Sequence, residues 1–66
     1  MEISYNRLWK LLIDKNMKKS ALREQTGMSS STMAKLSKNQ EVTMSVLMRI
    51  CETLDCNIED VMEFKK

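Results

Sequence analysis

The 66-residue sequence contains no histidine, no proline, one glycine, two cysteines and three aromatic residues. Without histidine the chain lacks the commonest general base and metal ligand. A tetrahedral zinc site would have to supplement Cys51 and Cys56 with carboxylates or with a second chain. The carboxylates are scattered along helix faces, and a chain of this size has no room for a large active-site cavity. The sequence therefore predicts no enzyme, metal, cofactor or small-molecule ligand.

Long apolar runs are also absent. The longest is Leu11–Ile13, whereas a membrane span needs about 20 apolar residues. The N-terminus has no apolar core of a signal peptide. We expect a cytoplasmic protein with no membrane partner, in which Cys51 and Cys56 act as small apolar groups rather than as a disulfide.

Charge is distributed unevenly along the chain. Residues 1–40 carry eight Lys or Arg and three Asp or Glu, a net charge of +5, while residues 41–66 carry three and six, a net charge of −3. This asymmetry is typical of a protein whose basic end meets a polyanion. An ordinary mixed solvated surface would produce the same pattern.

Apolar residues recur at helical spacing almost throughout, so residues 1–66 are predicted to form one all-α domain. We expect a first helix over residues 5–15 with Ser4 as its N-cap, a second over 19–25 and a third over 30–38. Thr43 should cap a fourth helix and Asn57 a short fifth. The apolar stripes that define these helices comprise Tyr5, Leu8, Trp9, Leu12, Ile13, Leu22, Met28, Met33, Leu36, Val46, Leu47, Ile50, Cys51, Leu54, Ile58, Val61, Met62 and Phe64.

The segment REQTGMSSSTMAKLSKN, residues 23–39, places the only glycine before three serines. Gly27 sits where the second helix needs a left-handed residue to end, and Ser29 or Ser30 can cap the third. Two short helices joined by a glycine turn, the second opening with small polar residues, are the sequence form of a helix-turn-helix.

In a helix-turn-helix, the second helix inserts its N-terminal end into the DNA major groove. Met28, Met33 and Leu36 are expected to face inward, which leaves an outward set of small or long polar side chains that can hydrogen-bond to base edges. This set consists of Ser30, Ser31, Thr32 and Lys35. The competing interpretation is that the serines form only a cap and a solvated turn.

The segments KSALREQTGMSSSTMAKLSKN and VTMSVLMRICETLDCNIEDVMEF resemble the Cro/C1-type helix-turn-helix domain of the XRE family over nearly the whole chain. The resemblance implies a five-helix, lambda-repressor-like fold that binds double-stranded DNA. It implies base contacts from Ser30, Ser31 and Lys35, with Thr32 beside them. It also implies contacts to the DNA backbone from Lys18, Lys19, Arg23, Ser29, Lys38 and Asn39.

Two positions depart from the family pattern. Lys18 stands where a Ser or Thr cap is frequent, and Arg23 stands where a small alanine is preferred. Either the Arg23 side chain extends outward and adds a phosphate contact, or the angle between the second and third helices differs from that in the family.

These features predict a sequence-specific, DNA-binding transcriptional regulator of a bacterial operon. It is expected to act as a homodimer and to place the helix at residues 30–38 in the major groove of the DNA. The alternative is a protein-interaction module, antitoxin-like or an adaptor, on the same scaffold. Its contact patch would be Met44, Met48, Met62 and Phe64.

Overall fold

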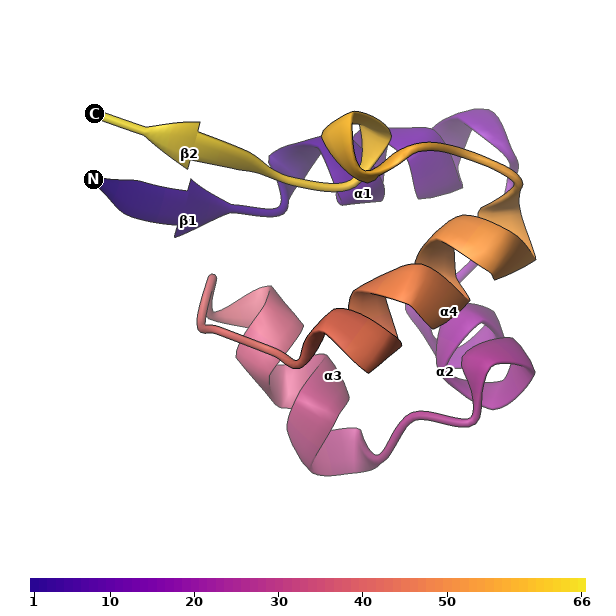
Figure 1. Ribbon diagram of the computed structural model, residues 1–66. Helices are drawn as coiled ribbons and strands as arrows, with labels where there is room; N and C mark the ends of the chain where they lie inside the picture. The colour runs from indigo at the N-terminus through magenta and orange to yellow at the C-terminus, as the bar shows by residue number, and fades with distance from the viewer.

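A computed structural model describes residues 1–66. The elements follow in the order β1 (Glu2–Ser4), α1 (Asn6–Asp14), α2 (Lys19–Thr26), α3 (Ser30–Ser37), α4 (Met44–Leu54), the 3-10 turn η1 (Ile58–Asp60) and β2 (Glu63–Lys65). Helix α4 crosses the middle of the molecule, α2 packs against it on one side, and α1 packs with η1 on the other (Figure 1). None of the helices combines the length and the apolar character that crossing a bilayer requires.

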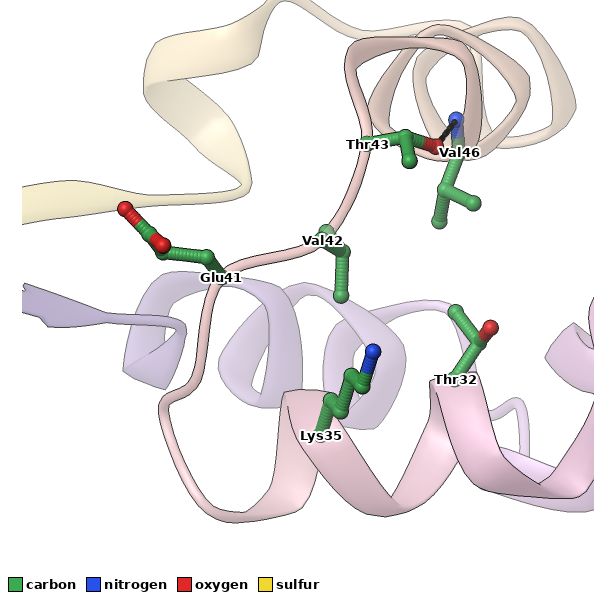
Figure 2. A pocket seen from close by; sticks show the side chains of 6 residues that line it. All are labelled: Thr32, Lys35, Glu41, Val42, Thr43 and Val46. Atoms are coloured by element: carbon green, nitrogen blue, oxygen red, sulfur yellow. Dashed lines mark hydrogen bonds between the residues drawn. The ribbon is translucent and has the colours of Figure 1, made fainter.

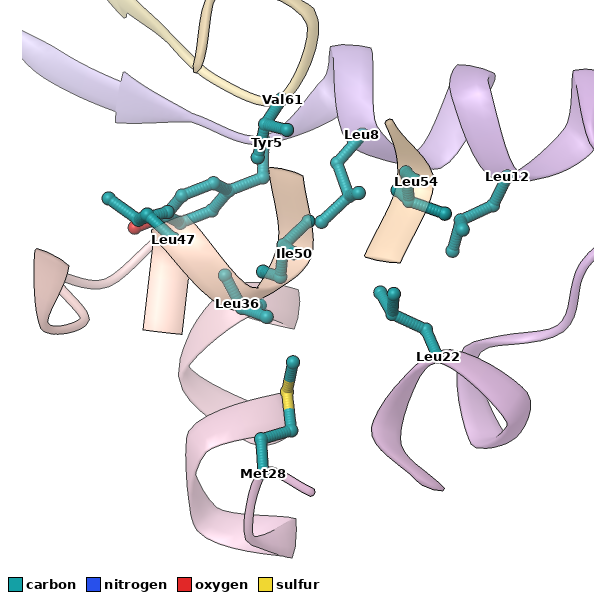
Figure 3. Close-up of a cluster of buried hydrophobic side chains, with 10 residues drawn as sticks. All are labelled: Tyr5, Leu8, Leu12, Leu22, Met28, Leu36, Leu47, Ile50, Leu54 and Val61. Atoms are coloured by element: carbon teal, nitrogen blue, oxygen red, sulfur yellow. The ribbon is translucent and has the colours of Figure 1, made fainter. Parts of the chain in front are cut away.

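All four helices contribute to one hydrophobic core (Figure 3). Leu8, Leu22, Leu36 and Ile50, one from each helix, are fully shielded from solvent. Burying a side chain of this size stabilises the fold by about 1.5–3 kcal/mol, so these four contacts fix the helices relative to one another. The core as a whole contains Tyr5, Leu8, Leu12, Leu22, Met28, Leu36, Leu47, Ile50, Leu54 and Val61.

The prediction of an all-α, five-helix chain was wrong at both ends. The fold is mostly helical, with four α-helices, one 3-10 turn and a two-stranded antiparallel sheet. The N–H of Asn57 donates to Asp60 Oδ2 at 3.1 Å, and this bond closes a single turn. Val61 is then buried, and the chain continues extended into β2 instead of completing an α-helix.

The sheet pairs Glu2 with Lys65, Ile3 with Phe64 and Ser4 with Glu63. Each strand has three residues, too few to produce a visible alternation of apolar and polar side chains. By pairing with β1 at the N-terminal end of the chain, β2 obtains the backbone hydrogen bonds that a fifth helix would otherwise have made internally. The expected apolar face of that helix is accordingly divided, because Val61 is buried while Ile58 and Phe64 are exposed.

The first helix is one residue shorter at each end than predicted. Its N-cap position is Tyr5, one residue after the expected Ser4, although Ser4 Oγ still accepts a hydrogen bond from the N–H of Asn6 at 3.3 Å. Ile13, expected in the core, is 76% exposed. Only Leu8 and Leu12 of this helix are fully buried, because the helix offers a narrower stripe to the core than its apolar sequence indicates.

Cys51 and Cys56 are free and pack against the core from either side of the α4 C-terminus. The N–H of Cys56 donates to the carbonyl of Cys51 at 3.0 Å, and Asp55 between them adopts a left-handed conformation with φ 52°. Burial, with a smaller contribution from Cys51, raises the pKa of the Cys56 thiol to about 11. Cys56 therefore closes the end of α4 as a neutral thiol.

We predict that stability falls as the pH rises from about 9 towards 11. Above pH 9 the unfolded chain releases the Cys56 proton, whereas the folded chain, in which the pKa of Cys56 is about 11, retains it. Urea denaturation across this range measures the effect, and Cys56→Ala should flatten the curve. The pKa of Tyr5 is also raised, mainly by burial, so some decline above pH 10 should persist in the variant. Identical curves for the wild type and Cys56→Ala would contradict the assignment.

Candidate nucleic-acid interface

Gly27 ends α2 in the left-handed conformation, with φ 73°, and its N–H donates to the carbonyl of Arg23 at 3.0 Å. Apart from Gly27 itself and its two chain neighbours, no residue places a heavy atom within 4 Å of the position that a Cβ would occupy. Glycine is therefore required for the backbone conformation and not for space. The buried side chain of Met28 follows at once and holds the turn against the core, so α3 leaves α2 in a fixed direction.

Ser29 is the N-cap of α3, which resolves the choice between Ser29 and Ser30. Its Oγ accepts a hydrogen bond from the N–H of Thr32 at 3.2 Å. The same oxygen lies 3.0 Å from Ser31 Oγ and 3.0 Å from Thr32 Oγ1. Ser29 was predicted to contact the DNA backbone, and in the free protein its hydroxyl is the centre of this cap.

Helix α3 presents a polar stripe to solvent. Ser30, Ser31 and Lys35 are exposed, whereas Leu36 on the opposite side is fully buried. Thr32 is half-buried and lies at the edge of this stripe, not within it. Ala34 is exposed between Ser31 and Lys35 and was missed as a candidate, although its spacing of three residues from Ser31 indicates the same face. Its methyl group is suited to contact a thymine methyl.

A groove of about 310 Å³ separates α3 from the segment that leads into α4 (Figure 2). Thr32 and Lys35 form the wall on α3, and Val42 points toward them from the loop. The groove is completed by Glu41, Thr43 and Val46. As predicted, Thr43 caps α4, with its Oγ1 accepting a hydrogen bond from the N–H of Val46 at 3.3 Å. The groove therefore lies between the polar stripe and the N-terminus of α4.

Tyr5 holds the loop between α3 and α4. Its N–H donates to Asn39 Oδ1 at 3.1 Å, and its Oη donates to the carbonyl of Gln40 at 2.8 Å. Asn39 itself adopts φ 57°, a left-handed conformation that asparagine tolerates better than most residues. The side-chain oxygen of Asn39 is thus used within the fold, while Lys38 beside it is exposed. Tyr5 was predicted only as a core residue, because a contact across 34 positions leaves no local signal in the sequence.

Three basic residues lie on α2 and at its start. Lys18 and Lys19 are exposed, and Arg23 is half-buried with no hydrogen bond from its guanidinium within the chain. The Lys19 ammonium lies 4.2 Å from the centroid of the Trp9 ring. This cation–π contact limits where the ammonium can lie. Trp9 packs partly against the core, as predicted, and in addition carries Lys19 on its face.

The helix-turn-helix geometry agrees with the match to known families. The family model for the Cro/C1-type HTH DNA-binding domain matches residues 7–66. The chain belongs to this family, whose members are DNA-binding proteins and not enzymes.

Among solved structures, the chain is similar to the crystal structure of transcriptional regulator VanUg, Form II. The two share 56% sequence identity and superpose with a TM-score of 0.92, over 94% of this chain and 83% of that one. The search of curated proteins found no significant match.

The contact between Lys19 and Trp9 predicts a fluorescence change, because Trp9 is the only tryptophan. Lys19→Met keeps most of the aliphatic stem but removes the ammonium, so it should shift the Trp9 emission and cost about 0.5–1 kcal/mol in urea denaturation. Lys15→Met, on an exposed lysine after α1, is the matched control and should change neither quantity. Equal emission spectra for Lys19→Met and the wild type would mean that the cation is not held over the ring in solution.

Proposed function

We propose that the protein is a sequence-specific, DNA-binding transcriptional regulator of a bacterial operon, acting in the cytoplasm as a homodimer that inserts α3 into the major groove. The observation that carries this proposal is the exposed stripe of Ser30, Ser31, Ala34 and Lys35 on a helix held by a rigid turn and a capped N-terminus. Helix α3 contains no acidic residue. The 56% identity to a protein described as a transcriptional regulator supports the same reading.

In this proposal the contacts have two separate tasks. The basic residues flanking α3 meet phosphates and supply most of the affinity, which therefore falls as salt rises. They are Lys18, Lys19, Arg23 and Lys38. Asn39 can add a contact only through its amide NH₂, since Tyr5 occupies the amide oxygen. The half-buried Arg23, with its guanidinium free of partners in the chain, supports the outward-reaching interpretation of that position.

Base selectivity is assigned to Ser30, Ser31 and Lys35, with Ala34 as an apolar contact. Hydroxyl groups donate and accept, so they discriminate weakly between bases, whereas lysine favours the guanine acceptors. Thr32, at the edge of the stripe, orients the cap more than it reads a base. With so few base contacts in one copy, two copies on half-sites about 34 Å apart are needed for useful specificity.

Selection from a randomised duplex pool at near-physiological salt tests this function directly. Enrichment of paired half-sites about one helical turn apart is expected. Ser31→Glu should abolish this enrichment, because it places a carboxylate against the base edges. If only unspecific, salt-sensitive adsorption is found, the sequence-specific assignment is wrong.

Charge reversal on the proposed interface should abolish binding to the selected DNA. Lys35→Glu combined with Lys38→Glu removes two cations from the DNA-facing surface and adds two anions, one toward the base edges and one next to a phosphate. We expect affinity to fall by at least 10³-fold, measured by fluorescence anisotropy at fixed salt. Lys10→Glu with Lys15→Glu is the matched control, with the same change in net charge on exposed lysines of α1 and its C-cap. It should weaken binding far less. Equal losses in the two double variants would mean that binding follows net charge and not the α3 surface.

A further inference from the structure

The apolar surface of the molecule is concentrated on one face, formed by α4, η1 and β2. Six large apolar side chains are exposed, and four of them, Met44 (66%), Met48 (58%), Ile58 (42%) and Phe64 (64%), lie on this face. Between them is a groove of about 330 Å³ lined by five apolar residues, Met44, Leu47, Ile58, Met62 and Phe64, together with Glu59 and Glu63. A second hollow beside Met48, which Glu52 also lines, continues it along α4. We call this surface the methionine face. Contiguous apolar surface of this kind marks an interaction site.

The sides of α4 carry charges as well. Arg49 and Glu52 are exposed, three residues apart, and therefore neighbours on the helix surface next to Met48. Neither forms an ion pair within the chain, whose one salt bridge joins Arg7 to Glu63 at 3.1 Å. A purely basic partner would be repelled by Arg49, and a purely acidic one by Glu52. The side of α4 that carries Arg49 and Glu52 therefore favours a partner that places an acidic group opposite Arg49 and a basic group opposite Glu52.

We propose that a second copy of this chain covers the methionine face, with α4 packed antiparallel against α4 of the partner subunit. The proposal rests on the homodimer of the proposed function and specifies its interface. A two-fold axis perpendicular to two antiparallel helices places the same flank of each helix opposite its copy. With the axis midway between Arg49 and Glu52, each Arg49 meets Glu52 of the partner subunit, so the contact forms twice. Met48 then packs close to its copy across the axis, where a flexible methionine fills irregular gaps, while Met44 lies about 10 Å from the axis along the helix.

The same arrangement suits the spacing of DNA half-sites. Met44 begins α4, and its copy would lie about 20 Å away along the paired helices, from the rise of 1.5 Å per residue. Each α3 precedes its α4 by the loop of residues 38–43, so the two reading helices lie at opposite, outer ends of the pair. Half-sites are about 34 Å apart, which leaves about 7 Å for each loop to span. The residues that hold this loop, Tyr5 and Asn39, would then set the distance between the reading helices.

Single charge changes on the flank test the proposal by sedimentation equilibrium without DNA. Arg49→Glu and Glu52→Arg each turn two attractive contacts into two repulsive ones, so each should weaken the dimer about tenfold or more. An equimolar mixture of the two variants should form a heterodimer with near wild-type affinity, since every contact across its interface is again attractive. The double variant with both changes should restore the homodimer. Lys38→Glu and Glu24→Arg, made outside the methionine face, are the matched controls and should leave the dimer unchanged.

Met48→Lys should abolish the dimer while leaving the circular dichroism spectrum unchanged, because Met48 is already exposed in the single copy. A wild-type monomer at all concentrations overturns the proposal, as does a mixture of the two charge variants that fails to associate. These outcomes are separate from the proposed function. A monomer that still enriches single half-sites in the DNA selection would retain the sequence-specific DNA binding and lose the homodimer together with this interface. An intact dimer with no enriched DNA would retain the interface and lose the sequence-specific DNA binding.

Discussion

The C-terminal end of α3, the proposed reading helix, is held by Tyr5, which is buried between the start of α1 and the loop that follows α3. Its N–H and hydroxyl together hold Asn39 and Gln40, and its ring belongs to the core. Gly27 and Met28 fix the beginning of α3, so the helix is held at both ends. Because Tyr5, Gly27 and Met28 hold α3 through backbone groups and buried side chains, the polar stripe can present small, exchangeable side chains without losing its orientation.

The hydroxyl groups at the start of α3 serve the fold before they serve recognition. Ser29 caps the helix, and Ser31 and Thr32 lie within hydrogen-bond distance of its oxygen. In contact with a base, each of these hydroxyls would exchange one exposed hydrogen bond for another at little net cost. Lys35 and Ala34 have no such competing partner in the structure. Under the proposed function, base contacts this weak would have to be supplemented by contacts of the lysines to the DNA backbone and by a second copy of the chain.

The helices and the turn could be predicted from the sequence because their signals are local. The glycine at the end of α2, the cap Thr43 and the inward Leu22 and Leu36 follow from spacing alone, whereas spacing left Ser29 and Ser30 as alternative caps of α3. The two strands could not be predicted, since Ile3 and Phe64 find each other only in the folded chain. The same holds for Tyr5 with Asn39 and for Lys19 with Trp9. Ile13 was misplaced because an apolar residue at helical spacing need not face the core.

The pairing of β1 with β2 has a kinetic consequence. Glu2 and Lys65 are separated by nearly the whole chain, whereas the helices and the turn are built from contacts between near neighbours. Closing so long a loop carries the largest entropy cost of any contact in the fold, so the sheet should form after the helices have packed. The methionine face includes Phe64 of β2, so this face reaches its final shape only when β2 pairs with β1. A folding intermediate with packed helices but no sheet would then have α3 already in place, while the surface proposed for association would still be incomplete.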